Sequence, residues 1–250
     1  MILDRRKGRY NIYLAPKPDF RHGLFSEFYL CDSRGCHFGF IRKPFFTKLI
    51  DLREDFRKDI DKQTLYEYRR AVKDGCRSDL LLDTERYIDF FNRWSMAKGR
   101  GTKPPESIRI NADHMIFTAG YDKDGEMLVA HCYFVDRDAK RVILHMSSSL
   151  IYSGVDVKKK AEIGRCNRML HIDDMDRFKA EGFVTYDLGG YAKGTSDKQL
   201  LGINSFKDSF GGVLVESSNY VNILRGAALA VLNAVNRIAG VFMKKTKLAE

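Results

Sequence analysis

The segment from Tyr186 to Gly212, YDLGGYAKGTSDKQLLGINSFKDSFGG, constrains the fold more than any other part of the chain. It predicts a short apolar strand ending at Asp187, a break at a double glycine, and a helix that carries Phe206 and Lys207 and stops at a second double glycine. Glycine pairs mark places where the backbone needs a positive φ or must let another group come close. Two such places on either side of one lysine indicate a functional site rather than a loop that only connects two elements.

Length and charge narrow the class of protein. The chain has 250 residues, 44% of them hydrophobic, and a net charge of +10. This length suits one large domain or two small ones with a substantial core. The positive charge favours an anionic partner, which is a nucleic acid, a phosphorylated donor or an acidic membrane surface. A soluble protein whose lysines are merely solvated is an equally open interpretation.

The cysteines point to a reducing compartment. There are five, with no CxxC pair, and Cys132 and Cys166 lie in apolar patterns typical of small buried residues. We therefore expect neither a disulfide framework nor a metal site. The first ten residues, MILDRRKGRY, contain no apolar run, so no secretory signal is predicted and a cytoplasmic location is expected.

Hydrophobic periodicity and turn residues predict the order of elements. A hairpin of strands 24–31 and 36–41 is expected around Asp32–Gly35. A helix at 51–74 follows, and then a helix that begins with Thr84 as its N-cap and ends at Gly99. Further elements follow along the chain: a short strand at 78–82 before the Thr84 helix, strands at 115–121, 126–136 and 141–149 as an antiparallel meander, a helix at 161–181, strands at 183–188 and 213–218 around the Phe206 helix, and a long helix at 222–247. This order predicts an α/β fold with a central mixed, mainly antiparallel sheet flanked by helices.

Three parts are expected. Residues 1–44 form an N-terminal hairpin extension packed on the main domain, residues 45–221 form the main domain, and residues 222–250 form a C-terminal basic amphipathic helix. The one loop with linker composition, GRGTKPPES, is too short to separate independent domains.

At this point the sequence resembles a known family. The motifs GRCNRMLHIDDMDRFKAEGFVTYDLGGY and GINSFKDSFGG, with the spacing between them, are similar to the second half of Fem-type aminoacyl transferases, which build peptidoglycan cross-bridges. They are also similar to single-domain relatives often labelled BioF2-like acetyltransferases. A weaker match covers 65–75, Ala130-His131 and Asp136. The resemblance implies the Gcn5-related N-acetyltransferase (GNAT) fold. Full Fem ligases carry two copies of this fold and many have a helical arm associated with tRNA, and both are missing here.

Acyl transfer to an amine needs an unprotonated nucleophile, an oriented carbonyl and a stabilised oxyanion. Lys207 is the candidate for the third task, and the resemblance associates the pair Phe206–Lys207 with placement of the donor's terminal nucleotide. The alternative is a solvated lysine beside a core phenylalanine. Asp187 either caps the turn that follows it or orients a substrate amine. His145 completes the predicted catalytic set.

No single general base is chosen among His145, Asp136 and His171. The predicted donor- and substrate-binding residues are Gly189, Gly190, Tyr191, Arg165, Asn167, His171, Gly211 and Gly212. The glycines either let substrate lie against the backbone or allow a strand and a helix to pack tightly.

The anionic, phosphorylated donor is an acyl-CoA or an aminoacyl-tRNA. Coenzyme A users of this fold bind pyrophosphate at a helix N-terminus through a Q/R-x-x-G-x-G/A loop. The corresponding stretch here, 157–167, has one glycine and several cations but not that signature, which weakens a coenzyme A assignment.

The C-terminal stretch predicts an amphipathic helix with a basic end. Its apolar face comprises Leu224, Ala228, Val231, Leu232, Val235, Ile238 and Phe242, and its basic end comprises Lys244, Lys245 and Lys247. Arg237 interrupts it, so it does not span a bilayer. Peripheral membrane contact through 222–248 is one interpretation, and packing on its own domain or on a second subunit of a homodimer is the other.

The sequence and its resemblance to the Fem-type family thus predict an N-acyltransferase that moves an acyl or aminoacyl group onto an amine of a cell-envelope glycan precursor. We expect it to act in the cytoplasm, either free or at the inner face of the membrane. A sugar-nucleotide or lipid-linked amino sugar is the favoured acceptor, by family analogy. The alternatives are aminoacyl-tRNA-dependent transfer to a peptidoglycan precursor and a non-catalytic basic protein that binds tRNA or a membrane surface.

Overall fold

A computed structural model describes residues 2–6, 9–21, 23, 25–102, 106–109 and 111–227. The chain forms two compact units. Unit 1 comprises residues 1–2 and 46–216, and unit 2 comprises residues 3–45 and 217–250. Two long strands, β4 (Phe40–Asp51) and β10 (Val213–Asn222), run through both units.

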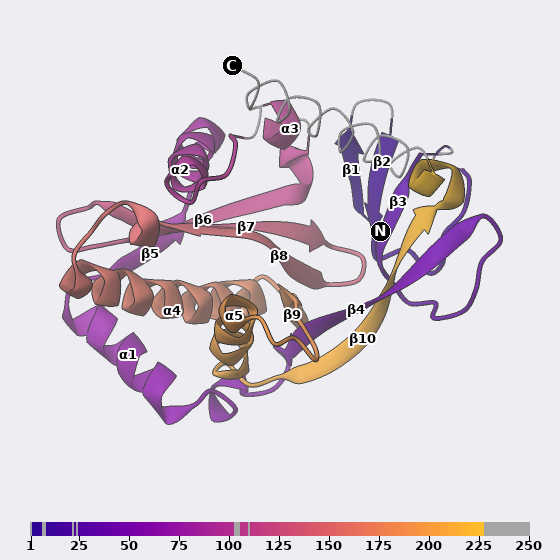
Figure 1. The fold of residues 1–250 in the computed structure, drawn as a ribbon. Coiled ribbons are helices and arrows are strands. Elements are labelled where there is room, and N and C mark those ends of the chain that lie inside the picture. Colours follow the sequence, from indigo (N-terminus) through magenta and orange to yellow (C-terminus); the bar gives the residue numbers. More distant parts are fainter. Residues whose placement is uncertain are drawn as a thin grey trace, which may run out of the picture. The chain divides into compact units, whose positions relative to one another are not determined.

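Unit 1 is built on a mixed sheet (Figure 1). Its further strands are β5 (Arg77–Leu80), β6 (Met115–Tyr121), β7 (Met127–Asp136), β8 (Arg141–Ser149) and β9 (Thr185–Gly190), in the order β4-β9-β8-β7-β6-β5. All neighbours in this series are antiparallel except β8 and β9, which are parallel. The predicted meander at 115–149 and the mainly antiparallel mixed sheet are confirmed.

Helices cover both faces of this sheet (Figure 1). The helices are α1 (Lys62–Lys73), α2 (Thr84–Ala97), α3 (Glu106–Arg109), α4 (Val157–Ala180) and α5 (Lys198–Asp208), with short 3₁₀ turns η1 (Phe56–Lys58), η2 (Ala112–His114) and η3 (Leu150–Tyr152). On one face α4 packs its buried Ile172 and Phe178 against Tyr133 and Tyr186 of the sheet. On the other face α2 places the Tyr87 ring 4.4 Å from that of Phe117.

Aspartates begin the longer helices. The side chains of Asp61, Asp83, Asp156 and Asp197 each accept a hydrogen bond from a backbone N–H in the first turn of α1, α2, α4 and α5. A carboxylate there satisfies a donor that has no partner within the helix and complements the helix dipole. The predicted N-cap Thr84 is therefore wrong by one residue, because Asp83 does that work for α2.

The predicted helix at 51–74 is wrong in its first half. Strand β4 continues to Asp51, and Leu52 N–H still donates to the carbonyl of Val184 at 2.9 Å. The chain then forms η1 and begins α1 only at Lys62. Both Ile50 and Leu52 are buried in the core, so pairing with the sheet overrides the helical periodicity of this stretch.

Unit 2 is a smaller layer of strands. Strands β1 (Ile2–Arg6), β2 (Arg9–Tyr13) and β3 (Glu27–Cys31) precede the second half of β10 in the order β1-β2-β3-β10, and β10 is followed by the start of β4. The predicted hairpin of 24–31 with 36–41 is therefore wrong, because β10 lies between its two strands. The pattern of apolar residues fixes a strand but not its partner. The turn is held instead by Tyr220, whose hydroxyl bonds to the carbonyls of Ser33 and Gly35.

Helical backbone follows β10 at residues 223–227. The remainder of the predicted C-terminal helix, including its basic end, lies outside the described residues. Among the helices that are described, none combines the length and the apolar character needed to cross a membrane.

Candidate functional site

The central feature of the site is the place where β8 and β9 separate. The two strands pair only over Arg141–Ile143 and Thr185–Asp187. Beyond that point β8 stays with β7, and β9 stays with β4 through Gly190. Each strand has an irregularity here, since His145 is the extra residue of a bulge on β8 and the register of β9 shifts before Gly190. Bulges of this kind terminate pairing and are frequent next to active sites.

The lysine of the motif reaches this separation. Lys207 Nζ donates a hydrogen bond to the carbonyl of Gly190 at 2.6 Å. Gly189 has a φ of +73°, and a Cβ there would lie 2.9 Å from the carbonyl oxygen of Leu144 and 4.0 Å from Lys207 Nζ. Any larger residue would clash with the backbone of β8 and crowd the ammonium. The structure thus brings together Lys207 and the first glycine pair.

Burial perturbs the Lys207 ammonium. It lowers the pKa of Lys207 from 10.5 to about 8, and the nearby carboxylate of Asp187 offsets part of that effect. Among the residues that the structure describes, no carboxylate forms an ion pair with Lys207. The group is therefore charged at neutral pH but gives up its proton more readily than a surface lysine. Such a group can stabilise a developing oxyanion and can protonate a leaving group.

Asp187 holds the end of β9 in place. It is fully buried and accepts hydrogen bonds from the Thr47 hydroxyl, from the Arg141 guanidinium at 2.5 Å and from Gly189 N–H at 2.8 Å. The bond to Gly189 is the turn-capping contact that was one of its two predicted roles. Thr47 and Arg141 are functional neighbours that sequence reasoning missed, because they come from strands distant in the chain.

His171 links Phe206 to the interior. Its ring centroid lies 5.5 Å from that of Phe206 and 5.0 Å from that of Phe210. The Arg168 guanidinium carbon lies 5.2 Å from the centroid of the Phe206 ring. Burial, together with His131, Lys207 and Arg168, holds the pKa of His171 well below its usual value. His171 is therefore neutral at physiological pH.

A buried network of polar side chains fixes His171. Its Nδ1 lies 2.7 Å from the Tyr186 hydroxyl, which lies 2.7 Å from the Tyr133 hydroxyl. Tyr133 in turn donates to Asp174 Oδ2 at 2.7 Å, and His131 Nδ1 lies 3.1 Å from the same oxygen. All five side chains are buried. A satisfied network at this depth is expensive to break and sets one orientation for each member.

Comparisons with known proteins bear on the fold. No protein-family model and no curated protein matches the sequence. Among solved structures the chain is similar to FemX, with a TM-score of 0.56 and 12% identity over 77% of this chain and 68% of that one. It is similar to L-PGS from Bacillus licheniformis, with a TM-score of 0.55 and 10% identity over 79% of this chain and 68% of that one. It is also similar to the C-terminal domain of a putative lysylphosphatidylglycerol synthetase from Agrobacterium fabrum, with a TM-score of 0.55 and 16% identity over 85% and 72%.

The chain has the GNAT fold, in the form shared by FemX and L-PGS. The motif predicted a strand that breaks off at the first double glycine, and β9 ends at Gly190. The fold is therefore confirmed, whereas the roles of Lys207 and the other site residues stay predictions.

Two of the predicted donor-binding residues, Arg165 and Asn167, have contacts away from Lys207. Arg165 forms an ion pair with Asp74 at the end of α1, at 3.3 Å. Asn167 accepts a hydrogen bond from His131 Nε2 at 2.9 Å and so belongs to the buried network. Neither contact brings these side chains to Lys207. Both were predicted from the motif that contains them. Arg165 pairs with the end of α1, whereas Asn167, one turn before His171 on α4, shares the face of His171 and meets the same network.

The remaining predicted residues divide into two groups. Tyr191 donates through its hydroxyl to Asp208 at 2.9 Å, and Asp208 also pairs with Lys48, so these groups line the end of β9 beside α5. The second glycine pair serves packing: a Cβ at Gly211 would lie 2.6 Å from the carbonyl oxygen of Asp59, and one at Gly212 would lie 2.5 Å from that of Leu49.

The two other candidate bases have structural contacts. His145 packs its ring against Phe134 at 4.2 Å between centroids. Asp136 accepts from Ala139 N–H at 3.0 Å and so closes the turn between β7 and β8. Neither contact identifies a general base.

The stretch predicted to grip a phosphate lies inside a helix. Residues 157–167 all belong to α4, so most of their N–H groups take part in its hydrogen bonds. The carboxylate of Asp156 accepts from Lys159 N–H at the helix start, where a phosphate would otherwise be bound. Lys159 Nζ itself is held by Asp122 at 2.7 Å, Glu126 at 3.0 Å and Glu162 at 3.3 Å. The structure therefore shows no coenzyme A pyrophosphate loop at this end of α4.

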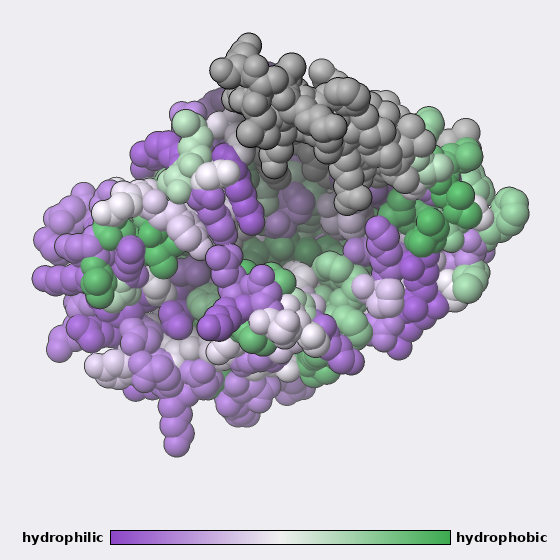
Figure 2. Space-filling model, viewed as in Figure 1, coloured by the Kyte–Doolittle hydropathy of each residue, from purple (hydrophilic) through white to green (hydrophobic). Residues whose placement is uncertain are grey.

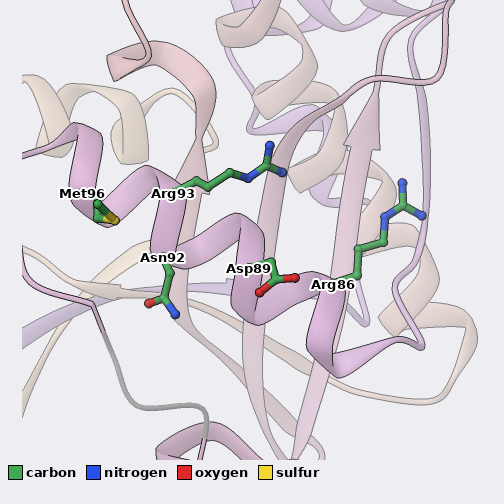
Figure 3. A pocket seen from close by; sticks show the side chains of 5 residues that line it. All are labelled: Arg86, Asp89, Asn92, Arg93 and Met96. Atoms are coloured by element: carbon green, nitrogen blue, oxygen red, sulfur yellow. The ribbon is translucent and has the colours of Figure 1, made fainter.

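A separate hollow lies along α2. It has a volume of about 460 Å³ and is lined by Arg86, Asp89, Asn92, Arg93 and Met96 (Figure 3). The side chains come from the outer face of a single helix, and none of the predicted site residues is among them. We assign this hollow no part in the chemistry.

Proposed function

We propose that the protein is an N-acyltransferase that moves an acyl or aminoacyl group onto an amine of a cell-envelope glycan precursor. The observation that carries the proposal is the half-buried Lys207 ammonium, with its pKa lowered to about 8, at the separation of two strands of a GNAT fold. Its surroundings support the same chemistry. Phe206 precedes Lys207 on α5 and packs against His171, and Gly189 lets the end of β9 come close to the Leu144 carbonyl of β8.

In the proposed reaction the amine nitrogen attacks the carbonyl carbon of the donor ester or thioester. A C–N bond forms, the bond from carbon to the leaving oxygen or sulfur breaks, and the proton of the attacking amine leaves with solvent or with the leaving group. Lys207 stabilises the negative charge that develops on the carbonyl oxygen and can supply a proton to the leaving group. An electrostatic donor of this kind in a water-poor site contributes roughly 100- to 1,000-fold to the rate.

Between the two donor classes, the contacts around α4 favour an aminoacyl ester of tRNA over an acyl-CoA. The carboxylate of Asp156 sits at the start of α4, and Lys159 is neutralised by three carboxylates. A pyrophosphate would meet repulsion there rather than free N–H groups. The names of two structural neighbours, lysylphosphatidylglycerol synthetase and L-PGS, are consistent with aminoacyl transfer. We propose an amino sugar, as a sugar nucleotide or on a lipid carrier, as the first acceptor to test.

The experiment compares donors with a surrogate acceptor. Purified protein is given either bulk tRNA charged with labelled amino acids or a series of acyl-CoA thioesters, and hydroxylamine serves as a small amine that any acyl donor can modify. We expect enzyme-dependent hydroxamate from charged tRNA. Hydroxamate from thioesters alone would contradict the donor assignment, and none from either donor would contradict the proposed function.

The non-catalytic alternative predicts a different pattern. A basic protein that merely binds tRNA would hold charged and uncharged tRNA equally, with no hydroxamate, and Lys207→Met would not alter that binding. The amino-sugar acceptor is then tested by replacing hydroxylamine with nucleotide amino sugars and following the label into the sugar by mass spectrometry.

A further inference from the structure

Almost all of the net charge of the chain belongs to unit 2. Residues 3–45 and 217–250 contain 14 lysines and arginines against five aspartates and glutamates, a net charge of +9 out of the +10 of the whole chain. Unit 1, which contains Lys207 and its surroundings, is close to neutral. Lys17, Arg21, Arg34 and Lys43 are exposed on unit 2. The charge that suggested an anionic partner is therefore separate from the proposed catalytic site.

Unit 2 also exposes large apolar side chains, which we call the unit 2 apolar cluster. Its members are Phe20, Phe25, Phe38, Ile41, Ile223 and Leu224. Phe38 is 95% exposed, and the others are between 43% and 55% exposed. Single exposed apolar residues are normal on a soluble protein, but a group of six large ones marks an interaction site.

Contacts show that these residues come from segments that meet. Ile223 N–H donates to the carbonyl of Gly39 at 2.9 Å, which joins the start of the last helical turn to the segment that carries Phe38 and Ile41. The ring of Phe20 covers Gly39 so closely that a Cβ there would lie 2.5 Å from the ring.

Two further contacts complete the group. Ile41 Cδ1 lies 3.7 Å from the position of a Cβ on Gly226, and Arg225 donates to the carbonyl of Phe25 at 3.1 Å. Within unit 2, hydrophobic side chains are visible around β3 and the start of β4 (Figure 2). The cluster therefore combines apolar side chains from four stretches of chain within the strongly basic unit.

We propose that unit 2 docks on the surface of a bilayer that contains anionic lipids. Phe38 and its neighbours would enter the boundary between headgroups and acyl chains, and the lysines and arginines around them would meet the lipid phosphates. Each cation near such a surface raises binding about fivefold, and the attraction decays within about 10 Å in ordinary salt. Neither charge nor apolar area alone gives stable attachment, and unit 2 supplies both.

The chemistry of the cluster favours a lipid surface over the other anionic or apolar partners. Proteins that stack unpaired RNA bases present aromatic rings on a sheet face, whereas half of this cluster is aliphatic and Phe38 projects from a turn. A symmetric dimer through the same face would bring two units of net charge +9 together. Repulsion of that size opposes self-association through this surface.

The test uses a natural reporter beside the cluster. Cys36 is exposed, and Cys31, Cys76, Cys132 and Cys166 are buried, so a thiol-reactive, polarity-sensitive dye attaches next to Phe38 without mutation. The labelled full chain is titrated with vesicles of phosphatidylcholine alone and with vesicles that contain one-third phosphatidylglycerol. We expect blue-shifted emission and co-sedimentation with the anionic vesicles only, weakened by added salt.

Substitutions separate insertion from charge. Phe38→Ser should weaken binding to the anionic vesicles about tenfold. Lys17→Glu combined with Lys43→Glu should weaken it further than Phe38→Ser does. Leu82→Ser is the matched control, because Leu82 is 88% exposed but belongs to unit 1. Circular dichroism confirms that each variant is folded.

Three outcomes would overturn the proposal. They are no binding to anionic vesicles, equal binding to vesicles with and without phosphatidylglycerol, and equal loss in Phe38→Ser and Leu82→Ser. A dye response to tRNA or to protein concentration, with none to vesicles, would assign the cluster to RNA or to a second copy instead. Because none of these readouts involves transfer activity, the proposal stands or falls independently of the proposed function.

Discussion

The perturbed lysine makes an unusual prediction about stability: removing it should stabilise the protein. Lys207 is charged at neutral pH, yet it is half-buried and has no ion-pair partner among the residues described. Lys207→Met keeps most of the side-chain volume and removes the charge. Residues that serve a site at the expense of stability are expected to behave in this way.

The size of the effect follows from the pKa. The pKa of Lys207 falls from 10.5 to about 8, and each pKa unit corresponds to about 1.4 kcal/mol. The charged ammonium therefore destabilises the folded state by at most about 3 kcal/mol, and solvent near the side chain reduces this figure. Methionine also gives up the hydrogen bond to the Gly190 carbonyl, which is worth about 1 kcal/mol. We therefore expect Lys207→Met to raise the free energy of unfolding by about 1–2 kcal/mol at neutral pH.

The sign of the pH dependence is fixed by the same values. Below about pH 8 Lys207 is protonated in both the folded and the unfolded state, so the folded state bears the full cost. As the pH rises from about 8 towards 10.5 the folded state loses the proton first, and the cost disappears. The advantage of Lys207→Met over the wild type should shrink across that window.

Lys48 is the matched control. It is also buried, but it forms an ion pair with Asp208. Lys48→Met leaves that carboxylate without its cation, so we expect a loss of about 1–2 kcal/mol. Urea unfolding of the three proteins, followed by circular dichroism at neutral pH and above pH 8, measures the difference. A loss of stability in Lys207→Met comparable to that of Lys48→Met, or a pH-independent difference, would refute the reasoning about Lys207.

Two further predictions concern the frame of the site. Gly189→Ala should lower the free energy of unfolding by about 3 kcal/mol or more, because its φ is +73° and the new Cβ would lie 2.9 Å from the carbonyl oxygen of Leu144. Gly182→Ala is the control: its φ is +85° but nothing lies within 4 Å of the new Cβ, so the loss should be about 1 kcal/mol. Equal losses in urea unfolding would show that the separation of β8 and β9 tolerates a side chain. Asp174→Asn should lower the free energy of unfolding by about 2–4 kcal/mol, because Tyr133, Thr118 and Arg177 all donate to that carboxylate inside the core. Asp176→Asn is the control: it changes a half-exposed ion pair with Arg57, so the loss should be under about 1 kcal/mol. Similar midpoints for these two variants would contradict the role given to the network.

The sequence predicted the fold where its signals are local and repeated. The meander at 115–149 alternates between strands and short polar turns, and the structure confirms each of its strands. The glycine pair after Asp187 likewise predicted a turn close to another backbone, and Gly189 approaches the carbonyl of Leu144 in that way. Such features depend on a few adjacent residues.

Pairing between distant segments was not predictable in the same way. The stretch at 24–41 looks like a hairpin, yet β10 enters between its strands from about 190 residues further along the chain. Nothing in the local pattern of Asp32–Gly35 distinguishes a hairpin turn from a loop that leaves room for a third strand.

The partners of the site residues were hidden for the same reason. Arg141 and Thr47 reach Asp187 from two other strands, and His131 meets Asp174 through tertiary packing. Conversely, Arg165 and Asn167 belong to the motif, but Arg165 pairs with Asp74 at the end of α1 and Asn167 with the buried His131. A helix distributes neighbouring residues around its axis, so proximity in sequence is a weak guide to proximity at a site.

The most direct test of the central claim is a single-turnover transfer assay with charged tRNA as donor and hydroxylamine as acceptor, because hydroxylamine is already unprotonated at neutral pH. We predict that Lys207→Met slows transfer by about 100-fold or more while Lys123→Met, at an exposed turn of unit 1, transfers at the wild-type rate. The wild-type rate should also fall as the pH rises through about 8, where Lys207 loses its proton. Transfer by Lys207→Met at the wild-type rate would contradict the account.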